Sequence, residues 1–281
     1  MEYVNCILCN SKEHFNTIEL VRDRFNPNEE YRIQECRCGM VLTNPRPDLK
    51  EISKHYQNQN YHPKNRINKV VSFFYRVAQI FNNRSKRKLI QKYFNKGYFL
   101  DYGGGNGQFQ RYMSKNNWKA DIYEPYLKVD GNEKKIKTIK DNYYDAISMF
   151  HSLEHVHDSE KALKDIDRAL KQKGILVISV PNHDAFERSI FKKKWIAYDA
   201  PRHLYHFTIK SIEEILNKNG FKVIEYKPVY IDTIYNILMS FDSKISYIFR
   251  APFLILNSLV QIYMNKNKAS SIMFVCNKDE N

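Results

Sequence analysis

The stretch FLDYGGGNGQFQ, residues 99–110, decides the fold of this 281-residue chain. Four of its nine glycines lie within five positions here, directly after an apolar run that contains Asp101. Glycine tolerates positive φ and lets a ligand lie against the bare peptide planes. We therefore predict a ligand-binding turn between a buried strand and a helix.

Strands and helices are predicted to alternate from residue 98 onward. Short apolar runs typical of buried strands are separated by segments whose apolar residues recur at helical spacing. Such alternation is typical of an α/β fold with a doubly wound, mostly parallel sheet, whose strands end along one ligand-binding edge. We expect strands at 98–102, 119–124, 144–150, 174–182, 221–229 and 270–278, and helices at 107–117, 158–172 and 209–220. Asp158 or Ser159 is expected to cap the second helix.

The glycine turn does not match two common phosphate-binding patterns. In G-x-G-x-x-G the third glycine would fall on Gln108 or Gln110, and no Gly-Lys-Ser/Thr follows as in a P-loop. Glu124 stands at the end of the next strand, where an acid accepts both hydroxyls of a ribose. Asp101 suits a positively charged ligand. These features favour an adenosyl group without a pyrophosphate.

With its glycine turn and two following segments, the chain resembles the class I S-adenosylmethionine-dependent methyltransferases. Those segments are YDAISMFHSLEHVHDSEKALKDIDRALKQKGILVISVPN and DAPRHLYHFTIKSIEEILNKNGFKV. The resemblance implies a Rossmann-like sheet of seven strands, the last antiparallel, and S-adenosyl-L-methionine as cofactor. It also implies contacts to the methionine and ribose from Asp101, Gly103 and Gly105, to the ribose hydroxyls from Glu124, and a cover formed by Phe150 and His151.

One segment departs from the family pattern. Residues 125–144 are short for the helix, strand and adenine-reading acid that the family fits there, and Asp141 is a poor candidate for that acid. The departure concerns adenine recognition and not the class of cofactor.

Histidines that follow the fourth and fifth strands of the family pattern are the candidate catalytic residues. Histidine titrates near neutral pH, so His203, His206 or His151 could remove a proton from a methyl acceptor. His151, Glu154 and His155 have i, i+3, i+4 spacing, which presents three metal ligands on one face of a helical turn. They are similar to the Glu-x-x-Glu-His metal site of ubiquinone-pathway and small-RNA methyltransferases. The alternative is that they only shape the cofactor pocket, and that His203 and His206 only fix their loops.

Four cysteines near the N-terminus predict a structural zinc site. Cys6 and Cys9 form one close pair, and Cys36 and Cys38 form a second. Four thiolates in two pairs can bind zinc tetrahedrally, and the alternative is reduced thiols without a metal. CGMVLTNPRP also resembles the zinc segment attached to many bacterial methyltransferases of this branch.

Net charge and hydropathy lead to three further predictions, on the surface, the location and the apolar run near the C-terminus. The formal charge is +14, but the lysines are scattered, and we expect the clusters at 84–88 and 192–194 to be solvated surface. Met1 to Cys9 lacks the features of a signal peptide, so a cytoplasmic location is expected. The apolar run within 234–264 predicts packed helices or a substrate lid, with contact to a membrane surface as the alternative.

The sequence thus predicts three parts: a zinc-binding segment at 1–60, a helical connector at 61–96 with two helices flanking Asn82-Asn83, and a methyltransferase domain at 97–281. We expect a methyltransferase whose acceptor is a small molecule or sugar-linked intermediate, as in cell-surface glycan or secondary metabolite synthesis. An RNA methyltransferase is a less favoured alternative, and an inactive binding module with the same fold is another.

Overall fold

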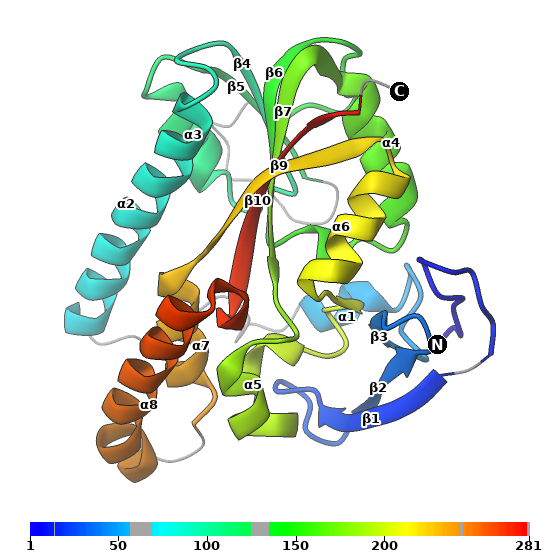
Figure 1. Ribbon diagram of the computed structural model, residues 1–281, viewed down its shortest axis with the longest axis vertical. Coiled ribbons are helices and arrows are strands. Elements are labelled where there is room, and N and C mark those ends of the chain that lie inside the picture. The colour runs from blue at the N-terminus through cyan, green and yellow to red at the C-terminus, as the bar shows by residue number, and fades with distance from the viewer. Residues whose placement is uncertain (14, 57–68, 125–134, 242–243, 280–281) are drawn as a thin grey trace.

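The computed structural model describes the chain except residues 14, 57–68, 125–134, 242–243 and 280–281. Its central sheet contains, within the described part, six strands in the order β5-β4-β6-β7-β10-β9 (Figure 1). These are β4 (Tyr98–Tyr102), β5 (Lys119–Tyr123), β6 (Tyr144–Phe150), β7 (Leu170–Pro181), β9 (Phe221–Pro228) and β10 (Ser271–Lys278). The α/β class and the mostly parallel sheet are confirmed.

The topology places the glycine turn where the strand order reverses. The chain goes from β4 to β5 on one side and then to β6 on the other, and all these pairings are parallel. Ligands of open α/β sheets bind at such switch points. β10 is antiparallel to both β7 and β9, as the family resemblance implies. The resemblance implies a seventh strand. Beside β5, Lys135 forms an isolated parallel bridge to Ile122, and the described residues form no full strand there.

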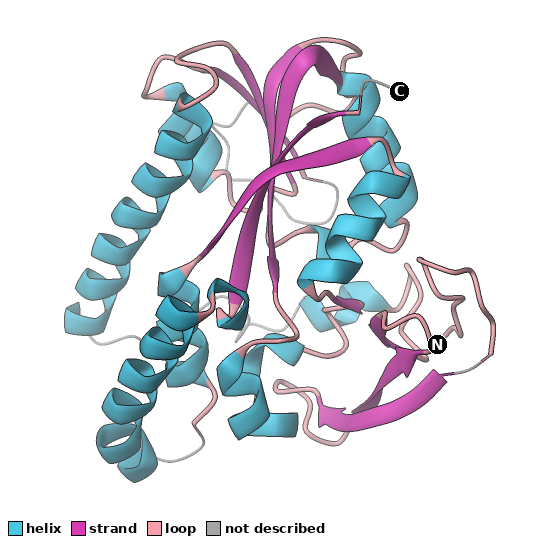
Figure 2. Ribbon diagram, in the orientation of Figure 1, coloured by secondary structure: helices cyan, strands magenta, loops and turns pink. Residues whose placement is uncertain are grey.

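Helices cover both faces of the central sheet (Figure 2). On one face lie α2 (Lys69–Gln91) and α3 (Gln108–Ser114), and on the other lie α4 (Ser159–Ala169) and α6 (Ile209–Lys218). The first pair packs Leu89, Ile90, Phe109 and Met113 against the sheet, and the second packs Leu163, Ile166, Ile212 and Leu216. Two apolar cores therefore hold the strands that position the turn.

The structure corrects two details of the predicted helices. Asn82-Asn83 does not break the connector, because α2 continues through it, and asparagine inside a helix costs only a few tenths of a kcal/mol more than a good helix former. Asp158 caps α4 as predicted, its side chain accepting a hydrogen bond from Lys161 N at 2.9 Å. However, α4 ends at Ala169, and buried Leu170 already pairs with Tyr144 at the start of β7.

The N-terminal region forms a second, antiparallel sheet in the order β1-β2-β3-β8. Its strands are β1 (Phe15–Arg22), β2 (Glu30–Cys36), β3 (Val41–Thr43) and β8 (Tyr205–His206), and a short helix α1 (Ile52–Tyr56) follows them. β8 comes from the PRHLYHF segment, far along the chain, and pairs with β3. Cys6, Cys36 and Met40 share one apolar core with residues of the central sheet. The N-terminal sheet is thus packed into the methyltransferase-like body.

The apolar run near the C-terminus forms two of the helices below the central sheet in Figure 1. α7 (Tyr230–Met239) packs on α8 (Lys244–Met264), and α8 also contacts α5 (Phe186–Phe191). The prediction of packed helices is therefore confirmed. No helix in the described part of the chain combines the length and the apolar character that crossing a bilayer needs. Contact with a membrane surface stays a prediction.

A buried ion cluster joins the two sheets. Arg202 is completely buried just before β8, and its guanidinium donates to both carboxylate oxygens of Asp23, at 3.0 and 3.2 Å. Asp23 follows β1, in the N-terminal sheet. The same guanidinium donates to Asp199 at 2.8 Å. Such a two-pronged contact fixes both distance and orientation.

Replacing Arg202 by Met should destabilise the protein strongly, because Asp23 and Asp199 would lose their buried cation and keep only the partly exposed Arg24 and His55 as ion-pair partners. We expect the free energy of unfolding to fall by about 3–5 kcal/mol, measured by urea denaturation. Arg168→Met is the matched control, because Arg168 bridges Asp141 and Asp165 at the surface, and such pairs contribute about 0–1 kcal/mol. Equal losses in the two variants would contradict the role assigned to Arg202.

Candidate functional site

The glycine turn connects β4 to α3 and has three glycines with positive φ, namely Gly103, Gly105 and Gly107. Gly103 has φ +69°, and a Cβ built on it would lie 2.5 Å from the Cβ of Ser152, so another segment approaches the bare backbone there. Gly105 has φ +57°, yet a Cβ built on it meets nothing within 4 Å among the described residues. The turn is therefore closed on the Gly103 side and open beside Gly105.

Two buried carboxylates converge on this turn. Asp101 is 3% exposed, and its Oδ1 accepts a hydrogen bond from Ser148 Oγ at 2.7 Å. Burial, helped by the nearby Glu124 carboxylate, raises the pKa of Asp101 to about 6. Glu124 is 5% exposed, and its Oε2 accepts from the backbone N–H of Gly105 at 2.9 Å. Both acids lie at the turn as expected, while their roles in cofactor binding stay predictions.

A buried lysine is the site residue that sequence analysis missed. Lys86 of α2 belongs to the basic cluster expected at the surface, but its side chain is 9% exposed. Its Nζ lies 4.0 Å from the centroid of the Phe150 ring, a cation–π contact at the end of β6. Burial lowers the pKa of Lys86, while the carboxylates of Asp232 and Asp101 counteract this effect. The cationic neighbour of Phe150 therefore comes from the 84–88 cluster, which local patterning assigned to solvent.

His151 is held between two carboxylates. Its Nε2 lies 2.9 Å from Asp232 Oδ2, and its Nδ1 lies 3.4 Å from Glu154 Oε1. Although burial alone would lower it, the two carboxylates raise the pKa of His151 to about 10. The ring is thus an imidazolium at neutral pH and has no lone pair for a proton. This arrangement argues against the predicted use of His151 as a base.

The two later histidines differ from each other. His206 in β8 is buried, with its Nε2 3.1 Å from Thr43 Oγ1, and burial together with His183 keeps its pKa well below the usual range. It therefore fits the structural alternative, fixing β8 on β3. His203 is partly exposed and donates from Nδ1 to Ala197 O at 2.8 Å. Burial and the neighbouring His155 lower the pKa of His203 to about 4, so it is neutral and remains the candidate base.

Asp141 lies away from the turn. It precedes the amino end of β6, and its Oδ1 is 3.1 Å from Arg168 Nε at the surface. The turn is at the opposite, carboxyl end of β4, which is parallel to β6. The structure thus supports the doubt about Asp141 as an adenine reader. Residues 125–134 of the short segment lie outside the described part.

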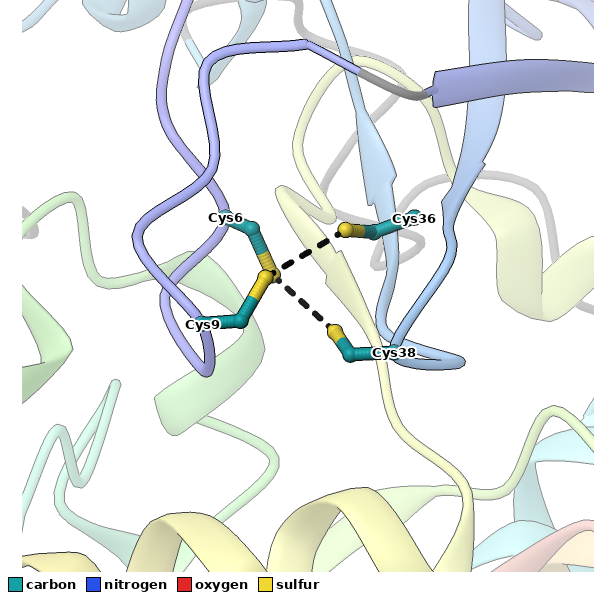
Figure 3. A group of neighbouring side chains, drawn as sticks. All are labelled: Cys6, Cys9, Cys36 and Cys38. Atoms are coloured by element: carbon teal, nitrogen blue, oxygen red, sulfur yellow. Dashed lines mark hydrogen bonds between the residues drawn. The ribbon is translucent and has the colours of Figure 1, made fainter.

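The four N-terminal cysteines converge from the first loop and from the end of β2 with the turn after it (Figure 3). Their sulfur atoms all lie within 4.8 Å of one another, with Cys6–Cys38 at 3.4 Å and Cys9–Cys36 at 3.5 Å. Four soft donors packed this closely are the ligand set of a tetrahedral thiolate site. The group therefore fits a metal of the zinc type.

Comparison with known proteins agrees with this geometry. Residues 46–226, more than half of the chain, match the family model described as a methyltransferase domain. The chain belongs to this family. It is thereby a member of the class I S-adenosylmethionine-dependent methyltransferase superfamily. An uncharacterised protein of Methanocaldococcus jannaschii is 29% identical over 202 residues, which cover 66% of this chain and 77% of that protein.

Solved structures share the fold at low sequence identity. The Burkholderia thailandensis 1,6-didemethyltoxoflavin-N1-methyltransferase is 12% identical with a TM-score of 0.50, and the match covers 95% of this chain and 100% of that one. The Haemonchus contortus phosphoethanolamine N-methyltransferase 2 is 19% identical with a TM-score of 0.46 over 70% of this chain. This chain spans only 53% of the Haemonchus protein.

Gly103 and Gly105, two of the positive-φ glycines of the turn, should respond differently to alanine. Both variants incur the left-handed backbone cost, about 1–2 kcal/mol, but only Gly103→Ala also forces its Cβ against Ser152. We expect Gly103→Ala to be less stable than Gly105→Ala by about 1–3 kcal/mol in urea denaturation. Equal stabilities would show that the turn is not closed at Gly103.

Proposed function

We propose that this methyltransferase uses S-adenosyl-L-methionine to methylate a small-molecule or sugar-linked acceptor. The observation that carries the proposal is the space beside Gly105, which no described residue fills and which lies next to the buried carboxylates of Asp101 and Glu124. The Burkholderia relative was solved with 1,6-didemethyltoxoflavin and S-adenosylhomocysteine, which supports a small acceptor by analogy. Its acceptor is not transferred to this chain.

The residues at the turn suit each part of the cofactor. When bound, S-adenosyl-L-methionine supplies an electrophilic methyl group on a sulfonium ion. Asp101, Gly103 and Gly105 would line its methionine and ribose, and the Asp101 carboxylate would attract the positive charge. Glu124, now engaged by Gly105 N–H, would accept hydrogen bonds from the ribose hydroxyls. Phe150 and His151 lie at the end of the neighbouring strand and would cover it.

The acceptor side is built by the segment that contains β8. Methyl transfer is an in-line displacement, so the protein mainly has to hold the acceptor carbon, nitrogen or oxygen against the methyl group. His203 is neutral at physiological pH and would take a proton where the acceptor must lose one. Its position is fixed by the Ala197 carbonyl and by Arg202 next to it in sequence. The N-terminal sheet, through β3 and β8, supports this segment.

Cofactor binding tests the proposal directly. Gly105→Arg should fill the open space and abolish binding of radiolabelled S-adenosyl-L-methionine, measured by equilibrium dialysis. Gly220→Arg is the matched control, because Gly220 also has positive φ (+80°) and open space around its Cβ, but lies in the α6–β9 turn. The control should bind like the wild type. Absence of binding by the wild-type protein would favour the inactive binding module, and equal binding by both variants would place the cofactor elsewhere.

The four cysteines are proposed to hold one structural zinc ion. A thiol-blocking mercurial should release about one zinc per chain, detected with a chromogenic chelator, because the thiolates are the only protein ligands of such a site. Cys9→Ala should lose this mercurial-released zinc. Cys276→Ala, which changes a buried cysteine of β10 outside the group, should retain it. Zinc release that is the same from both variants would exclude the cysteine group.

A further inference from the structure

Glu154 is a buried carboxylate that shares its neighbouring cation, the His151 imidazolium, with Asp232. It lies in the 3₁₀ turn η3 (Leu153–His155) with no exposed surface, and neither carboxylate oxygen accepts a hydrogen bond from a described residue. Burying a carboxylate without partners costs several kcal/mol. His151 is in ion-pair range at 3.4 Å, but it lies closer to Asp232, at 2.9 Å. Glu154 therefore sits in a place where a cation would be stabilising.

Two histidines complete a group of three potential metal ligands around it. One donor atom each of Glu154, His155 and His203 lies within 4.8 Å of the other two. The rings of His155 and His203 are 4.6 Å apart between centroids. His155 is next to Glu154 in sequence, whereas His203 arrives from the segment before β8, where Leu204 N donates to Glu154 O at 2.8 Å.

The hydrogen bonds of the two histidines define which ring nitrogen is available. His155 Nδ1 lies 2.9 Å from both Arg202 O and the Tyr56 hydroxyl, which can accept as well as donate, and His203 Nδ1 lies 2.8 Å from Ala197 O. A carbonyl oxygen only accepts, so Nδ1 carries the proton in both rings and Nε2 keeps its lone pair. Metal-binding histidines use this arrangement, since a carbonyl on one nitrogen orients the other.

We infer that Glu154, His155 and His203 bind a divalent transition metal ion. Two imidazoles and one carboxylate favour manganese, iron, cobalt, nickel or zinc over magnesium, which prefers oxygen ligands. Three protein ligands leave coordination positions open for an oxygen atom of a substrate. This ligand set differs from the one that spacing indicates, because Asp232 engages His151 and His203 takes its place. The inference concerns metal binding alone and holds whether or not the proposed methyl transfer is correct.

The experiment uses the full chain with its cysteine site loaded with zinc. Mn²⁺ is the first probe, because thiolates prefer zinc and Mn²⁺ binds them weakly. Loss of the free Mn²⁺ signal in electron paramagnetic resonance gives the number of sites, and nitrogen couplings of the bound ion report histidine ligands. Zinc is the second probe. A second zinc ion should resist the mercurial but be removed by a chelator.

Variants separate this site from the alternatives. We expect one bound Mn²⁺ in the wild type, and about 100-fold weaker binding in Glu154→Gln and His203→Gln. His151→Asn on the same turn is the comparison variant and should not weaken Mn²⁺ binding, because it removes a positive charge beside Glu154 and no proposed ligand. His203 is partly exposed, so its variant tests the site even if Glu154→Gln fails to fold. Absence of both a bound Mn²⁺ and a second zinc in the wild type would overturn the inference. If His151→Asn lost Mn²⁺ binding while His203→Gln retained it, the ligands would instead be His151, Glu154 and His155, the set that the sequence spacing indicates.

Discussion

The structure depends on the burial of two carboxylates at the end of β4 and of its neighbour β5. A buried acid needs donors or nearby positive charge, because desolvation otherwise favours its neutral form. Glu124 obtains its donor from the bare backbone of Gly105, and Asp101 obtains one from Ser148 on the adjacent strand. The glycine turn, the order of β5, β4 and β6, and the position of Ser148 therefore have to fit together. The same carboxylates remain beside open space, where a cationic ligand with a ribose would relieve part of their desolvation cost.

A second set of constraints connects the N-terminus to this site. The end of β2 and the turn that follows it carry Cys36 and Cys38, and β3 pairs with β8 through Val41 and His206. Arg202, immediately before β8, binds Asp23 beyond the far end of β1. The segment that presents His203 is therefore held from two sides by residues of the first sheet. A change in the cysteine group should therefore alter the position of the acceptor-side segment through the pairing of β2 with β3 and of β3 with β8. This effect needs no direct contact between the two sites.

Local patterns were sufficient for the central sheet and for the turn. Runs of apolar residues indicated each of its six described strands, glycine spacing indicated the turn, and Asp158 indicated the start of α4. What local patterns could not show were contacts between distant segments. Lys86 looks like one of several surface lysines until α2 is packed on Phe150, and His151 looks like a base until α7 brings Asp232 to it. β8 has only two residues, and it exists because β3 offers a free edge. The charge states of the histidines followed from these long-range contacts.

His203 has a role in both proposals, as the base in methyl transfer and as a metal ligand. Both roles use the same ring nitrogen, Nε2. Its Nδ1 proton is committed to the Ala197 carbonyl, so Nε2 is the nitrogen left to accept a proton or to bind a metal. It cannot do both at once. With a metal bound at Nε2, an acceptor hydroxyl coordinated to that metal would lose its proton more readily, because a divalent cation lowers the pKa of a bound oxygen. Without a metal, the neutral imidazole is itself the base. The buried carboxylate of Glu154 favours the first arrangement, since its oxygens accept no hydrogen bond from a described residue and the nearby His151 imidazolium lies closer to Asp232.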